Sequence, residues 1–145
     1  MFKYVKYIQI MNTETQIIDY GSISISPDMK SIYAWIESHG FKQAEFKKGR
    51  DYVSTYWGNR TIGFKLIERE NYRTYYIVGP KGSLIVLEIA IEDNKILYDF
   101  YSPIWLFGIW IIKLKLKQDA PWYASYLSTG YKIQEKFEKR FNMLQ

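Results

Sequence analysis

A row of ionisable side chains in the second half of the chain is the feature of this sequence best suited to chemistry. If two strands pair around a two-residue turn at Asp93-Asn94, Glu88 lies directly opposite Asp99. A four-residue loop before the first of these strands, and a two-residue loop before that, extend the row across four strands. Its predicted members are Glu68, Arg73, Glu88 and Asp99.

Carboxylates placed side by side on a sheet repel each other, so the pKa of one of them is expected to rise. Glu88 and Asp99 could then serve as the general acid and base of a small enzyme. The same oxygens could hold a divalent cation. We favour a third role, an ion network between strands that is centred on Arg73, and we therefore predict no catalytic residue, no metal site and no cofactor.

The composition excludes most other catalytic chemistry. The chain has 145 residues, no cysteine and one histidine, His39. Disulfides, cysteine nucleophiles and cysteine-based metal centres are therefore absent, and a single histidine cannot supply a site that needs several. His39 falls at the end of a predicted helix, where we expect it to cap the helix. No phosphate-binding loop, dinucleotide fingerprint or hydrolase nucleophile motif is present.

The row of charges requires an antiparallel meander to position it. β-branched and aromatic residues alternate with short turns of Gly, Asn, Asp and Pro, which is typical of hairpins. The strands are predicted near residues 51–57, 61–68, 72–78, 83–92 and 95–101, after two earlier strands at 2–11 and 16–25. Both faces of the meander carry apolar residues, so we expect one helix to cover each face.

Two helices are predicted to pack on this sheet. The first covers residues 27–39, with Ser26 as its N-cap, Gly40 as its C-terminal stop and an apolar face at Met29, Ile32, Tyr33 and Ile36. The second lies near the C-terminus, where Gly130 is a possible break and where Tyr126, Ile133, Phe137, Phe141 and Leu144 share one face.

Residues 104–112 are apolar on all sides and fit either a buried strand or a short helix. With that point open, the sequence predicts one α+β domain over residues 1–145. It consists of a mostly antiparallel meander of six to eight strands, one helix after the second strand and a C-terminal helical segment.

Aromatic residues are the second candidate functional feature. Tyr, Trp and Arg are the usual anchors of protein interfaces, and aromatic residues make up 19% of this chain. The candidate contact residues are Tyr52, Tyr56, Trp57, Tyr75 and Tyr101. Our first hypothesis is a non-enzymatic binding protein that acts on a protein partner, as small inhibitors, immunity-type proteins and mobile-element accessory proteins do. A homodimer is a further possibility.

Positive charge gathers in the last part of the chain. The formal net charge is +5, and residues 104–145 hold seven basic and three acidic side chains. The candidate anion contacts are Lys113, Lys115, Lys117, Lys132, Lys136, Lys139 and Arg140. Nucleic-acid binding through this segment is therefore the alternative hypothesis. The longest apolar run, residues 103–112, is shorter than the roughly 20 residues of a membrane span, and no secretory signal is recognised, so we expect a cytoplasmic protein.

Overall fold

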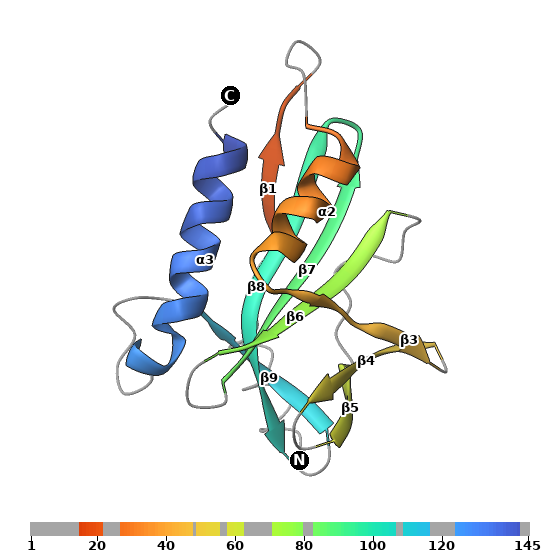
Figure 1. The fold of residues 1–145 in the computed structure, drawn as a ribbon, viewed down its shortest axis with the longest axis vertical. Coiled ribbons are helices and arrows are strands. Elements are labelled where there is room, and N and C mark those ends of the chain that lie inside the picture. Colours follow the sequence, from red (N-terminus) through yellow and green to blue (C-terminus); the bar gives the residue numbers. More distant parts are fainter. Residues whose placement is uncertain are drawn as a thin grey trace, which may run out of the picture.

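The computed structural model describes residues 15–21, 27–47, 49–55, 58–62, 71–79, 83–106, 109–116 and 124–142. These residues form two antiparallel sheets and two helices, which confirms the α+β prediction (Figure 1). The larger sheet has the order β1-β8-β7-β6-β2, with β9 also paired to β8. Its strands are β1 (Gln16–Asp19), β2 (Lys42–Gln43), β6 (Tyr72–Val78), β7 (Leu84–Glu92), β8 (Lys95–Leu106) and β9 (Ile109–Lys115).

The smaller sheet has the order β3-β4-β5 and consists of β3 (Glu45–Lys47), β4 (Arg50–Thr55) and β5 (Gly58–Ile62). Because Thr55 pairs with Gly58, strand β5 begins at Gly58, inside the break between the strands predicted at 51–57 and 61–68. The predicted strands at 2–11 and 61–68 lie largely outside the described residues. The short strands β2 and β3 were not predicted.

The turn between β7 and β8 sets the register of the larger sheet. Asp93 and Asn94 have φ values of 48° and 60°, a backbone conformation that Asn and Asp tolerate better than most residues and that two-residue hairpins require. Glu92 consequently pairs with Lys95, and Glu88 pairs with Asp99. This part of the predicted register is confirmed.

The apolar segment after Tyr101 is a second hairpin and not a helix. β8 continues to Leu106, which pairs with Ile109 at the start of β9. The register shifts between Ile104 and Trp105, as it does at a β-bulge. The strand alternative for residues 104–112 is therefore correct.

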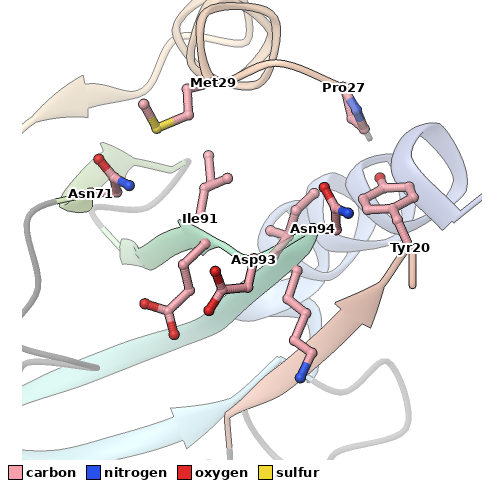
Figure 2. A pocket seen from close by; sticks show the side chains of 10 residues that line it. Tyr20, Pro27, Met29, Asn71, Ile91, Asp93 and Asn94 are labelled. Atoms are coloured by element: carbon pink, nitrogen blue, oxygen red, sulfur yellow. The ribbon is translucent and has the colours of Figure 1, made fainter. Parts of the chain in front are cut away.

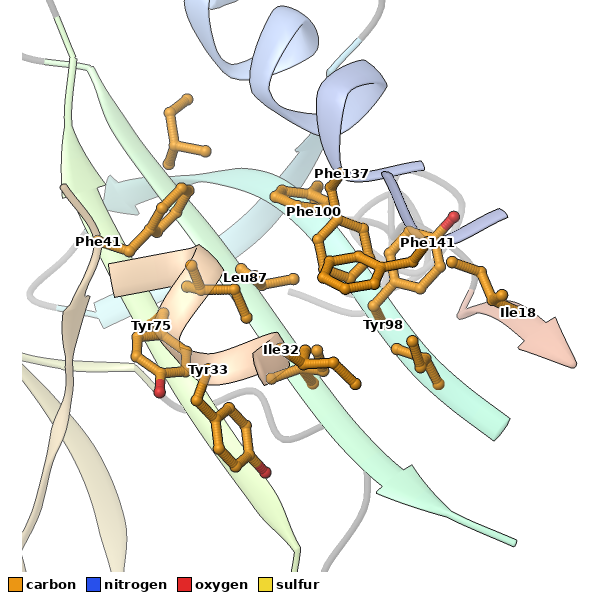
Figure 3. Packing of buried hydrophobic residues seen from close by; sticks show 14 of the residues in the cluster. Ile18, Ile32, Tyr33, Phe41, Tyr75, Leu87, Tyr98, Phe100, Phe137 and Phe141 are labelled. Carbon is orange, nitrogen blue, oxygen red and sulfur yellow. The ribbon is translucent and has the colours of Figure 1, made fainter. Parts of the chain in front are cut away.

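Both helices, α2 (Met29–Ser38) and α3 (Ala124–Asn142), pack on the same face of the larger sheet (Figure 3). The ring of Phe137 is fully buried and lies 5.1 Å from Tyr98, 5.5 Å from Phe100 and 5.7 Å from Trp35, between centroids. The expectation that the two helices cover opposite faces is wrong, because the smaller sheet covers the other face.

The ends of α2 differ slightly from the prediction. Asp28, and not Ser26, is the N-cap, because its carboxylate accepts a 2.7 Å hydrogen bond from the Ser31 backbone N–H. At the other end, His39 Nδ1 lies 2.8 Å from the carbonyl oxygen of Trp35, and its ring stacks on the Trp35 indole. The expected capping role of His39 fits this contact.

Helix α3 passes through Gly130 without a break, contrary to the expectation. A Cβ atom at this position would lie 2.8 Å from Ile85 Cδ1 and 3.1 Å from Leu116 Cδ1. Glycine therefore allows the helix to approach the sheet closely. Two tyrosine hydroxyls hold the C-terminal half of α3: Tyr98 donates to Glu138 Oε2 at 2.5 Å, and Tyr20 donates to the Phe141 carbonyl at 2.6 Å.

The position of Phe137 makes a direct prediction about stability. We expect Phe137→Ala to lower the free energy of unfolding by about 3–5 kcal/mol, because it empties the centre of the aromatic cluster. The neighbouring Lys136 is exposed, so Lys136→Ala should change stability by no more than about 0.5 kcal/mol. Urea denaturation measures both, and equal effects of the two variants would contradict this packing.

Candidate functional site

The candidate site lies between the two sheets, where the smaller sheet covers the larger one. A single segment links them, because β2 pairs with β6 whereas β3, two residues later, pairs with β4. Between them the Ala44 N–H donates to the Thr74 carbonyl at 2.8 Å. At the far side β5 contacts β9 (Figure 1), so the strands curve around a common interior. Its apolar members are Ala44, Val53, Ile62, Tyr76, Leu84, Val86 and Tyr101.

Three carboxylates are buried in this interior. Glu88 is 0% exposed, Asp99 is 3% exposed and Asp51 is 5% exposed. Thr74, Glu88 and Asp99 occupy one cross-strand row, because β7 pairs with β6 on one side and with β8 on the other. Asp51 reaches the row from β4 of the smaller sheet. Burying such groups is costly unless they find polar partners, so their contacts determine whether the arrangement is stable.

The hydroxyl groups of Thr74 and Tyr72 are hydrogen-bond partners of the buried carboxylates, and they connect Asp51 to Glu88. The Thr74 hydroxyl donates to Asp51 Oδ2. The Tyr72 hydroxyl lies 2.7 Å from Thr74 Oγ1, 3.2 Å from Glu88 Oε1 and 3.4 Å from Asp51 Oδ2. Asp51, Thr74, Tyr72 and Glu88 thus form a continuous chain of oxygen–oxygen contacts, which we call the hydroxyl chain.

Tyr101 completes the polar surroundings. Its side chain is 0% exposed and lies in the same interior. Burial raises the pKa of the Tyr101 hydroxyl well above its ordinary value, and the neighbouring Glu88 and Asp99 raise it further. The hydroxyl therefore remains protonated at any physiological pH.

Arg73 is not part of this cluster, contrary to the sequence prediction. Val78 pairs with Leu84, so five residues and not four separate the two strands. This one-residue difference pairs Arg73 with Ile89 and turns its side chain to the helix-covered face. There the guanidinium lies 3.9 Å from the centre of the Tyr33 ring, and its Nη1 donates to the Tyr75 hydroxyl at 2.9 Å. The remaining predicted member, Glu68, lies outside the described residues.

Sequence reasoning missed Asp51, Tyr72 and Thr74. Asp51 belongs to the cluster only because β4 folds across the larger sheet, and no local pattern predicts that contact. The alternation of Asp51 and Val53 with Tyr52 and Ser54 does indicate that the first two share a face. Correct counting of the loop between β6 and β7 would have placed Thr74 opposite Glu88.

The cluster is sealed from substrate by the burial of its carboxylates. A general acid or base must reach within hydrogen-bond distance of the reacting group, which side chains exposed by 0–5% do not do in this conformation. Among the described residues, no three His, Cys, Asp or Glu side chains are arranged to hold a metal ion. The geometry instead fits a polar interior that fixes how the two sheets meet.

The aromatic residues predicted to contact a partner differ in their exposure to solvent. Tyr75 and Tyr101 are both 0% exposed, so the expectation that they are available to a partner is wrong. Tyr75 is buried because the corrected register turns it to the helix-covered face of the larger sheet. Tyr101 is buried because the smaller sheet, β3–β5, covers its face. Tyr52 is half-buried on β4. Tyr56 and Trp57 lie outside the described residues.

The basic residues predicted to contact an anion lie on two different elements, α3 and β9. Four cations on α3 are exposed to solvent, namely Lys132, Lys136, Lys139 and Arg140. On β9 the backbone register pairs Lys113 with Pro103 and Lys115 with Tyr101. Lys117 lies outside the described residues. Neither described helix has an apolar stretch long enough to cross a membrane.

A small cavity lies apart from the cluster, between the start of α2 and the turn that joins β7 to β8 (Figure 2). Its volume is about 220 Å³, and its lining includes Tyr20, Met29, Asn71, Ile91 and Asn94. Ligand pockets usually have volumes of about 300–1,000 Å³. This cavity is smaller than that range, and its charged lining residues, Glu92, Asp93 and Lys95, lie at the β7–β8 turn, where Asp93 and Lys95 are exposed to solvent.

Comparison with known proteins identifies no relative. No protein-family model matches the chain, and neither the curated proteins nor the solved structures include a significant match. The functional proposals below therefore rest on the residues of this chain alone.

The hydroxyl chain predicts a matched pair of variants. Thr74→Val keeps the shape of the side chain but leaves the buried Asp51 carboxylate without its nearest donor, so we expect a loss of about 1–3 kcal/mol in unfolding free energy. Thr74→Ser keeps the donor and should retain most of the stability. Urea denaturation of both variants checks this, and a Val variant as stable as the Ser variant would show that the hydrogen bond contributes nothing.

Proposed function

We propose that this chain is a non-enzymatic binding protein that docks on a protein partner through the hairpin formed by β3 and β4. The observation that carries the proposal is the exposure of Phe46. This side chain is 64% exposed on β3, more than the other exposed large apolar residues of the described chain. A phenyl ring in water costs free energy that a partner can recover by covering it.

The hairpin presents two different faces beside Phe46. Lys47 Nζ lies 3.3 Å from Glu45 Oε2 and 5.6 Å from the centre of the Tyr52 ring. The exposed Arg50 follows on β4. Because side chains alternate along a strand, these charged groups and Tyr52 lie on the face of the hairpin opposite to Phe46. The hairpin also extends from the body of the molecule (Figure 1), which makes it accessible.

The sealed carboxylates favour binding over catalysis. The alternative of a small enzyme using Glu88 and Asp99 needs those side chains to meet a substrate, and in the described structure both are buried. A binding role makes no such demand on the interior. An inhibitor, an immunity-type protein or an accessory protein of a mobile element would each present a rigid surface of this kind.

The Phe46 surface can be tested by comparing capture by two variants. We expect Phe46→Ser to lose a specific protein that the native chain captures from lysate of its own source, with little change in stability. Val78→Ser is the matched control, since Val78 is also exposed, at 48%, but lies at the end of β6. Quantitative mass spectrometry of the captured proteins measures the difference. If every captured protein is retained by Phe46→Ser, this surface is not the docking site.

Nucleic-acid binding is a second candidate, supported by a different surface. Lys132, Lys136 and Arg140 follow one another at four-residue intervals along α3, and residues at this spacing share one face of a helix. All are exposed, as is Lys139, which forms a 3.4 Å ion pair with Glu135. A positive stripe of this kind complements a phosphate backbone.

This second candidate predicts a dependence on salt. If the four cations contact duplex phosphates, the logarithm of the binding constant should fall with the logarithm of salt concentration with a slope of about −3.6. Lys136→Gln should reduce the slope by about 0.9, whereas Lys30→Gln on the exposed side of α2 should not change it. Fluorescence anisotropy with a labelled duplex measures both. Absence of binding at low salt would eliminate this candidate.

A further inference from the structure

Arg73 is a half-buried cation that two tyrosines hold in a fixed position. Its guanidinium carbon lies 3.9 Å from the centre of the Tyr33 ring, and its Nη1 donates to the Tyr75 hydroxyl at 2.9 Å. The Tyr33 hydroxyl in turn donates to the Asn71 carbonyl at 2.9 Å. Both tyrosine side chains are buried, and their hydroxyl groups point away from Phe137 (Figure 3). The guanidinium therefore has little freedom to turn.

These contacts do not neutralise the charge of Arg73. Burial raises the pKa of the Tyr33 and Tyr75 hydroxyls, so both are uncharged at physiological pH. Among the described residues no carboxylate forms an ion pair with the guanidinium, and the exposed Glu37 of α2 acts on it only through space. A charge partly withdrawn from water is costly unless an opposite charge accompanies it. Arg73 is therefore prepared to accept an anion from outside the chain.

The direction of the contacts defines where such an anion would bind. The Tyr33 ring covers one face of the guanidinium plane, and Tyr75 takes a hydrogen bond from Nη1. The edge formed by Nε and Nη2 donates to no acceptor in the described part of the chain. The N–H groups of this edge point in parallel, which is the arrangement that holds two oxygens of one oxyanion.

We propose that Arg73 is the centre of a carboxylate-binding site, in which Tyr33 and Tyr75 are positioning residues. A carboxylate is planar, so it can lie in the plane of the guanidinium with one oxygen on Nε and the other on Nη2. Its single negative charge neutralises Arg73, whereas a phosphate dianion leaves excess negative charge beside Glu37. The site is separate from the Phe46 surface, because Arg73 faces the helices and Phe46 belongs to the smaller sheet.

Nitrogen-15 NMR of the native protein tests the site without a substitution, because it follows the Nε–H signal of each arginine. Sodium acetate replaces sodium chloride in steps at pH 7 and constant ionic strength. We expect the Arg73 signal to shift and then saturate, while the signal of Arg50, which is exposed on β4, stays nearly constant. Shifts of equal size at both arginines, or no shift at either, would overturn the proposal.

Two variants separate anion binding from a purely structural role of the arginine. Arg73→Lys keeps the charge but loses the fork, so acetate affinity, followed through the backbone amide signals of β6, should fall about tenfold. Glu37→Gln removes a competing negative charge at an exposed position and should raise the affinity about two- to threefold. Arg50→Lys is the matched control and should bind acetate as the native protein does. An affinity that is unchanged in Arg73→Lys or in Glu37→Gln would contradict the site.

Two further probes define the ligand. A blocked peptide with a single glutamate that binds more tightly than acetate would assign the carboxylate to a protein side chain, and weaker binding would assign it to a free acid. Inorganic phosphate at the same ionic strength should bind at Arg73 more weakly than acetate. Tighter binding of phosphate would overturn the assignment to a carboxylate.

Discussion

The two-residue turn at Asp93-Asn94 is the constraint on which the rest of the structure depends. Its positive φ values fix how β7 pairs with β8. Because side chains alternate along a strand, this register directs Leu87 to the helices and Glu88 to the smaller sheet. A slip of one residue would bury the carboxylate against Phe137 and expose the aliphatic row to Asp51. The turn therefore determines which β7 and β8 side chains face the helices and which face the smaller sheet.

The polar interior explains why the two sheets meet in a single arrangement. Carboxylates that are almost completely buried destabilise a fold unless donors reach them. Thr74 and Tyr72 on β6 supply those donors to Asp51 on β4, across the space between the sheets. A displacement of β4 would remove Asp51 from the Thr74 and Tyr72 hydroxyls, so these hydrogen bonds favour the observed arrangement. Phe46 and the cations of α3, which carry the two functional proposals, lie outside this interior and are exposed.

The sequence predicted what depends on local pattern and missed what depends on contacts between distant segments. The β7–β8 register, the apolar face of α2 and the strand character around Lys113 all follow from turn residues and periodicity. One extra loop residue after Val78 was enough to exchange Thr74 for Arg73 in the row, because a single step reverses the face of every side chain. The layer that covers Glu88 was not foreseen, since β2 and β3 have two and three residues. Strands so short carry too little alternation to be recognised.

The central claim is that Thr74, and not Arg73, stands opposite Glu88 beneath the smaller sheet. Interstrand nuclear Overhauser effects between β6 and β7 test it most directly, because they report the register without any substitution. We expect cross-strand contacts that pair Thr74 with Glu88, together with contacts from the Thr74 side chain to Asp51 on β4. Contacts that pair Arg73 with Glu88 would contradict the register, and with it the hydroxyl chain.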